Sequence, residues 1–149
     1  MVSPSKPAAM AMAMAQTFLD ENVEALLSND FEAIRRMCSL PFRLETMDKK
    51  RILRTTEGLK TASTACYESL RSRNISHIIR RCLEAAWCDP ETICVLYETR
   101  YVSGGRFLTY EPYLSLATLR LEEGRWKLSS MQFASDEAEP IIRLVNHEL

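Results

Sequence analysis

The sequence predicts an α+β fold in which three N-terminal helices pack on a strongly curved, mainly antiparallel sheet. The first half of the 149-residue chain is helical in pattern, whereas the second half contains long runs of β-branched, aromatic and aliphatic residues. The clearest run, residues 110–133, predicts two long strands joined at Glu123-Gly124. Long strands that follow a helical half indicate a sheet that bends around the helices.

The helical half divides into three helices. The first begins near Pro7, which the first turn of a helix tolerates, and its larger apolar side chains form one stripe: Phe18, Val23, Leu26 and Leu27. Asp30 can cap a short second helix at 31–37, which forms a helical hairpin with the first. Leu40-Pro41 then ends the helical structure, and a third helix is expected at 57–71.

Turn residues divide the remaining sequence into six strands. The first two form a small hairpin around the polar turn Asp48-Lys49-Lys50, and the other four form an antiparallel meander. The expected strands are 42–47, 51–55, 78–87, 93–102, 107–122 and 124–134. The expected core includes Phe18, Phe42, Leu44, Leu59, Leu96, Leu116, Leu128 and Phe133.

Both faces of the meander carry apolar residues. Along 93–102, one phase holds Val95 and Tyr97, and the other holds Cys94 and Leu96. A sheet with water on one face would be polar on one phase. We therefore expect helices on one face and a second copy of the chain on the other, so that the protein is a homodimer paired through its sheet.

Charge and hydropathy exclude several classes of partner. The chain has 19 basic and 20 acidic residues and a net charge of −1, without the basic excess typical of nucleic-acid binders. The short clusters Lys49-Lys50-Arg51 and Arg80-Arg81 are interpreted as solvated strand and turn positions. No stretch approaches the roughly 20 apolar residues of a membrane span, and residues 8–15 are interpreted as helix rather than signal peptide.

The cysteines predict neither a metal site nor a disulfide framework. There are five of them, and they contain no C-x-x-C pair: Cys38, Cys66, Cys82, Cys88 and Cys94. We interpret them as free buried thiols in a reducing cytosol, so a cytoplasmic location is expected. No metal and no cofactor is expected.

Residues 15–135 resemble the nuclear transport factor 2-like (NTF2-like) superfamily, which includes the SnoaL-like proteins. The order of elements and two segments, 23–34 and 119–128, carry this resemblance. It implies a cystatin-like α+β cone whose helices and concave sheet enclose a pocket, and which commonly dimerises through the sheet. It also implies one domain over 1–149, with 1–14 as a helical extension that can fray.

Ketosteroid-isomerase-like members of this superfamily offer a test at residue level. Their tyrosine, their carboxylate base and their second acid fall on Asn22, Thr46 and Ala117 of this chain. None of the three functional groups is retained. Glu45 is one residue from the base position, but a shift of one residue in a strand turns a side chain to the opposite face.

Candidates for a pocket come from the expected strands and the third helix: Glu45, Tyr67, Tyr97, Glu111, Tyr113 and Met131. Burial of Glu111 beside tyrosines would raise its pKa and suit it to proton transfer. The alternative is a cross-strand ion pair with Arg100 on an exposed face. His77 is interpreted as a surface or interface residue, and Trp87 and Trp126 as core or dimer-contact aromatics.

Two functions follow from these expectations. The first is a homodimeric domain that binds a hydrophobic small molecule and has no catalytic motif. The second is an isomerase, dehydratase or cyclase that acts on a hydrophobic substrate in the same pocket. An enzyme needs a carboxylate or histidine within reach of the pocket, so the residues that line the pocket decide between the two.

Overall fold

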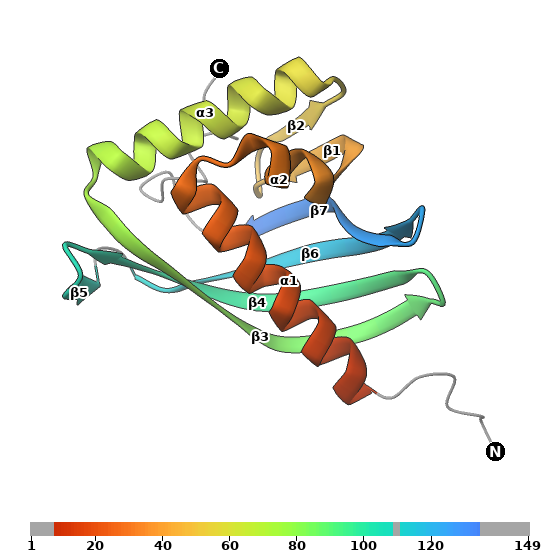
Figure 1. Ribbon diagram of the computed structural model, residues 1–149. Coiled ribbons are helices and arrows are strands. Elements are labelled where there is room, and N and C mark those ends of the chain that lie inside the picture. Colours follow the sequence, from red (N-terminus) through yellow and green to blue (C-terminus); the bar gives the residue numbers. More distant parts are fainter. Residues whose placement is uncertain (1–7, 109–110, 135–149) are drawn as a thin grey trace.

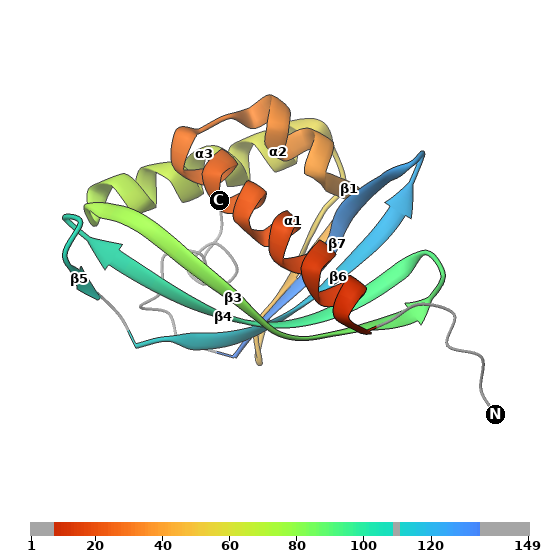
Figure 2. The same ribbon diagram turned by 60° about the horizontal axis from the view of Figure 1, so that its bottom comes forward.

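The computed structural model describes residues 8–108 and 111–134. Three helices lie together on one side of a curved sheet (Figures 1 and 2). They are α1 (Ala8–Ser28), α2 (Phe31–Met37) and α3 (Thr56–Ser72). The strands are β1 (Cys38–Glu45), β2 (Lys50–Leu53), β3 (Ile75–Asp89), β4 (Thr92–Ser103), β5 (Phe107–Leu108), β6 (Tyr113–Glu122) and β7 (Arg125–Ala134). The α+β class and the three N-terminal helices are as predicted.

The main path of the sheet has the strand order β2-β1-β7-β6-β4-β3, and β5 pairs with β4. Strands β3, β4, β6 and β7 form the predicted antiparallel meander. The parallel pairing of β1 with β7, which the sequence pattern did not indicate, joins the small hairpin to the meander. Register shifts in β3, one of them between Cys82 and Glu84, mark places where a strand can bend.

Short-range signals place several element ends as expected. Asp30 caps α2, because its carboxylate accepts a hydrogen bond of 3.2 Å from the backbone N–H of Ala33. Thr55, which was expected to end a strand, instead caps α3 in the same way through the N–H of Gly58. Glu123 and Gly124 both have positive φ angles, as a two-residue hairpin turn between β6 and β7 requires.

Helix α1 crosses the concave side of the sheet and packs mainly on β3 (Figure 1). β3 is an edge strand, so one side of its backbone lacks a partner strand. The side-chain amide of Gln16 supplies partners there: its Nε2 donates to the carbonyl of Arg80 at 2.8 Å, and its Oε1 accepts from the N–H of Cys82 at 2.8 Å. These two bonds tie α1 to this edge.

Two strand predictions were wrong in detail. β1 begins at Cys38 directly after α2 and includes Pro41, whereas the pattern placed the strand start at Phe42. The expected strand 107–122 is divided into β5 and β6, and Glu111 and Pro112 belong to neither. Proline cannot donate a ladder hydrogen bond, which explains why β6 begins after Pro112. Tyr110 lies outside the described residues.

The disulfide between Cys88 and Cys94 corrects the expectation that all five cysteines are free and buried. The bridge links the ends of β3 and β4, and both of its residues are exposed. Cys38, Cys66 and Cys82 are free and buried, as expected. The β3–β4 hairpin brings the Cα atoms of Cys88 and Cys94 within 6.3 Å, although Cys94 is directly opposite Ala86, and spacing alone did not reveal this.

The two faces of the sheet differ in burial. The inner face meets the helices and contributes fully buried side chains such as Ile93, Val95 and Tyr101. The outer face carries Leu116, which is 50% exposed, and Leu96, which is half-buried, although both were expected in the core. Within the described ranges, no helix combines the length and the hydropathy of a membrane span.

Candidate functional site

A cavity of about 60 Å³ lies between the three helices and the inner face of the sheet. Most of its wall is apolar, and three of its residues are polar: Asn22, Ser63 and Arg80. The other lining residues are Leu26, Ile34, Cys38, Phe42, Leu44, Leu53, Leu59, Ala62, Cys66, Leu128 and Met131. The cavity occupies the place where a ligand pocket is expected in a cone of this kind.

Arg80 is buried in this wall. Its side chain is 4% exposed, and it is the one charged residue buried among the residues that the structure describes. The interpretation of Arg80-Arg81 as a solvated cluster was therefore wrong for Arg80. Successive side chains of a strand point to opposite faces, so Arg80 joins Ile78 and Cys82 on the inner face while Arg81 is exposed.

The guanidinium of Arg80 is only partly satisfied. Its Nη1 donates to the Oδ1 of Asn22 at 2.7 Å, and its Cζ lies 5.5 Å from the ring centroid of Tyr97. Its Nε is buried without a hydrogen-bond partner, as is the Oγ of Ser63 in the same cavity wall. Buried polar atoms of proteins nearly always have a partner, so two such atoms at one cavity call for an explanation.

The titratable groups around Arg80 remain neutral near pH 7. Burial raises the pKa of the Cys66 thiol to about 12, although the nearby charge of Arg80 lowers it. Burial likewise raises the pKa of Tyr97, against smaller lowering effects of Arg80 and Ser115. The pKa of Tyr101 is raised well above its ordinary value by burial and by Tyr113, whose hydroxyl lies 2.7 Å from its own.

Three of the six pocket candidates, Tyr97, Tyr113 and Met131, are buried in this interior. Met131 lines the cavity, and Tyr97 lies under the guanidinium of Arg80. Tyr113 is buried on the inner face against Tyr101. Tyr67 lies half-buried on α3, where Arg71 stacks over its ring at 5.8 Å.

The two carboxylate candidates lie elsewhere. Glu45 accepts a hydrogen bond of 2.9 Å from Gln132 on the outer side of β1 and β7, and it does not line the cavity. Glu111 is exposed in the segment before β6. Arg100 forms an exposed ion pair of 2.9 Å with Glu98.

The positions tested against the ketosteroid isomerases differ in their surroundings. Asn22 lies in the cavity, and Ala117 is buried on the inner face. Thr46 lies in the turn between β1 and β2, where its hydroxyl accepts from the N–H of Lys49. His77 is exposed on β3, with its Nδ1 2.9 Å from the hydroxyl of Ser76.

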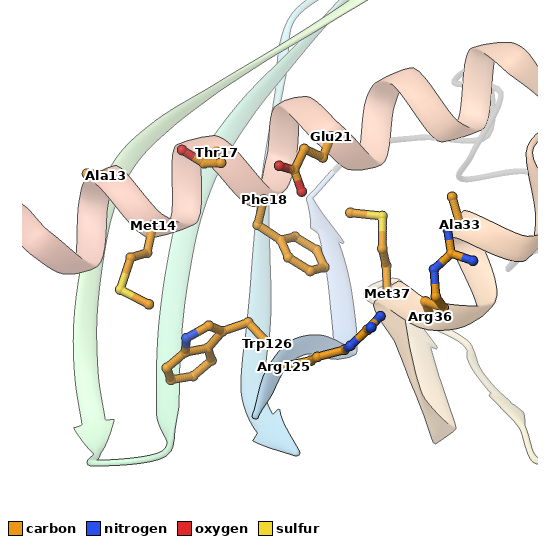
Figure 3. A pocket seen from close by; sticks show the side chains of 10 residues that line it. All are labelled: Ala13, Met14, Thr17, Phe18, Glu21, Ala33, Arg36, Met37, Arg125 and Trp126. Atoms are coloured by element: carbon orange, nitrogen blue, oxygen red, sulfur yellow. The ribbon is translucent and has the colours of Figure 1, made fainter. Parts of the chain in front are cut away.

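A second hollow is an open groove of about 670 Å³ between α1, α2 and the tip of the β6–β7 hairpin (Figure 3). Phe18, Met37 and Trp126 form part of its apolar wall, and Arg36 and Arg125 are exposed beside it. Trp126 also packs edge-to-face on Trp87, with ring centroids 5.7 Å apart. The arginines of this groove are exposed to water, whereas the arginine of the cavity is buried.

Sequence reasoning missed Asn22 as a cavity residue in its own right, together with Ser63 and Arg80. The sequence does contain a signal that Arg80 is buried. It shares one phase of its strand with Ile78 and Cys82, whereas Ile79 and Arg81 occupy the other phase. An arginine with apolar neighbours at i−2 and i+2 shares their face. Ser63 could be found in the same way, one turn from Leu59 and Cys66 on the apolar stripe of α3.

Within the described ranges, no three His, Cys, Asp or Glu side chains are grouped to hold a metal ion. The cavity instead offers hydrogen-bond donors, a positive charge and an apolar wall. Such an arrangement can bind and orient a small polar head attached to an apolar body.

Comparisons with known proteins identify the fold. No protein-family model and no curated protein matches the chain. A Nostoc punctiforme domain of unknown function with a cystatin-like fold is similar, with a TM-score of 0.66 and 9% identity over 87% of this chain and 80% of that one. An NTF2-like protein of unknown function from Shewanella oneidensis gives a TM-score of 0.65 and 12% identity over 83% and 100%.

A de novo designed protein with a curved β-sheet is also similar, with a TM-score of 0.54 and 16% identity over 81% of this chain and 99% of that one. Sequences with so few residues in common can share a backbone without sharing a function. The chain therefore has the cystatin-like fold of the NTF2-like proteins, as its sequence predicts.

Proposed function

We propose that the protein binds a small, largely apolar molecule in the cavity inside its cone, and that it does so as a homodimer paired through the outer face of the sheet. One observation carries the binding function. The cavity has an apolar wall into which two buried polar groups, Arg80 Nε and Ser63 Oγ, are placed without partners. A bound molecule would supply the missing hydrogen bonds.

The size of the cavity limits the ligand. Pockets for drug-sized molecules typically hold about 300–1,000 Å³, whereas this cavity measures about 60 Å³. One buried water needs at least about 10–15 Å³, so the space suits a molecule of few non-hydrogen atoms. A steroid or polyketide would require large movements of the surrounding side chains.

The lining of the cavity favours binding over the alternative of an isomerase, dehydratase or cyclase. Acid–base catalysis needs a carboxylate or an imidazole within hydrogen-bond reach of the substrate. Among the residues that the structure describes, those that line the cavity include neither group. Glu45 and Glu111, the carboxylates considered for this role, lie outside it.

A cavity-filling variant tests the binding function. Ala62→Leu places a larger side chain in the cavity, and Ala65→Leu makes the same change on the same helix away from the cavity wall. Small alcohols, ketones and aromatic compounds are screened by thermal unfolding, because a ligand that binds the folded state raises the Tm. We expect compounds that stabilise the parent and Ala65→Leu to lose this effect in Ala62→Leu. Equal stabilisation of all three proteins would contradict binding in the cavity.

The outer face supports the homodimer. Leu96 lies opposite Leu116 on the neighbouring strand, and Leu114 beside them is 43% exposed. Large apolar side chains gathered on one exposed face are typical of interaction surfaces. A second copy would bury these leucines and explain why the outward-facing phase of β4 and β6 carries apolar residues.

The oligomeric state is measured by size-exclusion chromatography with light scattering. We expect twice the 17.1 kDa mass of one chain at micromolar concentration. Leu116→Glu should return the monomer mass, because it would bury an unpaired charge in the interface. Met47→Glu, at a position that is 86% exposed in the β1–β2 turn, is the matched control and should leave the dimer intact. A monomeric parent protein would contradict the dimer.

We also propose a cytoplasmic location. Three buried free thiols support it. The Cys88–Cys94 disulfide is a bond typical of oxidising compartments, and it counts against a reducing cytosol.

A further inference from the structure

The cavity of the proposed function contains a positive charge that no buried acid of residues 8–108 and 111–134 balances. Among the described residues, the buried polar and charged side chains are those of Asn22, Ser39, Ser63, Arg80, Thr99 and Ser115, and Arg80 alone of these is charged. The described ion pairs are Arg35–Glu32 and Arg100–Glu98, neither of which involves Arg80. A buried charge is costly unless it is paired, so this arrangement needs an anion.

The neighbouring titratable groups do not supply that anion. Tyr97 lies under the guanidinium and Cys66 lines the same cavity, and burial raises the pKa of both. Both groups are therefore neutral near pH 7, whereas a guanidinium keeps its charge in proteins. The negative charge has to enter the cavity from outside this set of residues.

The geometry of Arg80 leaves room for such a partner. The hydrogen bond to Asn22 uses Nη1, and the buried Nε remains without a partner. A guanidinium presents its donors as a planar fork that matches the two oxygens of a carboxylate. The unpartnered hydroxyl of Ser63 adds a donor to the same cavity.

We infer that the cavity binds a short aliphatic monocarboxylate, with its carboxylate on Arg80 and its hydrocarbon chain against the apolar wall. This inference rests on the proposed binding function and names the chemical class of the ligand. The hydrocarbon chain follows from the lining, since Leu26, Phe42, Met131 and eight further apolar or thiol side chains surround the polar groups. The short length follows from the volume of about 60 Å³.

Calorimetric titration of the full chain with matched compounds tests the inference. Butyrate carries the carboxylate, and butyramide has a similar size and shape without the charge. We expect butyrate to bind at least about tenfold more tightly, as charge-assisted hydrogen bonds imply. Chloride and phosphate at equal ionic strength test for a site that accepts any anion, and both should bind more weakly than butyrate.

Two substitutions on neighbouring positions locate the effect. Arg80→Met should remove the preference for butyrate, so that butyrate binds no more tightly than butyramide. Arg81→Met removes the adjacent exposed arginine and should change neither affinity. The comparison of butyrate with butyramide on the unsubstituted protein needs no variant, so it decides the inference even if Arg80→Met does not fold.

The outcomes separate the inference from the proposed function. If butyramide binds as tightly as butyrate, and Ala62→Leu abolishes both, the cavity binds small molecules but the carboxylate inference is overturned. Binding of phosphate or chloride as tight as that of butyrate would also overturn it. If no butyrate, butyramide or screened compound binds, the proposed function itself fails.

Discussion

The two faces of β4 and β6 each contain exceptions to the usual division into an apolar inside and a polar outside. On the inner face, Tyr97, Thr99 and Ser115 are almost completely buried, whereas on the outer face Leu114 and Leu116 are 43% and 50% exposed. Packing alone would favour the opposite arrangement, because burying polar groups costs free energy and burying leucines gains it. Under the proposed function, a second copy of the chain covers the leucines of the outer face, and the helices and the inner face enclose the ligand.

Truncation of one apolar side chain on each face should give the largest difference in the free energy of unfolding between the inner and the outer face. Ile93 is fully buried on the inner face, and Ile93→Ala should lower the free energy of unfolding by about 2–5 kcal/mol. Leu116→Ala should cost less than about 1 kcal/mol in the monomer. Urea unfolding at several protein concentrations measures both. A cost for Leu116→Ala that grows with protein concentration would show that its face is buried in a dimer.

Alkaline pH should destabilise the folded protein through two buried thiols of the cavity wall, Cys38 on β1 and Cys66 on α3. Burial raises the pKa of both Cys38 and Cys66 to about 12, from 9.0. Above pH 9 the unfolded chain releases these protons and the folded chain retains them, so stability falls as the pH rises. By pH 10 the two thiols together should cost about 3 kcal/mol relative to pH 7.

The control for this pH effect is the double variant Cys38→Ala with Cys66→Ala. Its free energy of unfolding should fall less steeply between pH 8 and pH 10, as measured by urea unfolding in the presence of reductant. The same slope in both proteins would show that these thiols titrate normally in the folded state.

The Cys88–Cys94 disulfide should change the free energy of unfolding by less than the titration of the two buried thiols does. Closing a loop of this length stabilises a protein by about 2 kcal/mol in the chain-entropy estimate, and the hairpin already holds Cys88 near Cys94. We expect three reactive thiols in the denatured, unreduced chain and five after reduction, counted with a thiol reagent. Five thiols without reductant would contradict the bridge.

Removal of one polar pair on each face should give the smallest difference in the free energy of unfolding. Tyr101→Phe removes one hydroxyl of the buried Tyr101–Tyr113 pair and should cost about 1 kcal/mol. Arg100→Ala breaks the exposed ion pair with Glu98 and should cost at most about 0.5 kcal/mol, because water and salt screen it. Thermal unfolding at low and high salt distinguishes them, since only the second depends on salt.

Much of the fold was predictable because its signals are local. The cap at Asp30, the turn at Glu123-Gly124 and the apolar stripe of α3 each depend on residues close in the chain. The parallel pairing of β1 with β7 was not predictable in this way. It joins segments about 90 residues apart, and no residue pattern in either strand indicates which strand it pairs with.

The candidate site was less predictable than the fold. Met131 and Tyr97 were named in advance, and both lie around the cavity or beneath Arg80. Arg80 was not predicted as a site residue, because two adjacent arginines suggest a solvated pair. A strand turns such neighbours to opposite faces, so one of them can be buried while the other is exposed.

The sequence by itself determined the order of the elements, their turns and caps, and thus the class of the fold. The tertiary structure alone decided which phase of each strand faces inward. Side chains of a strand alternate between the two faces of the sheet, and since both sets contain apolar residues, the sequence does not show which set is buried. Packing of α1 across the sheet settles the choice: it buries Tyr97 and Arg80 and leaves Leu114 and Leu116 at the surface.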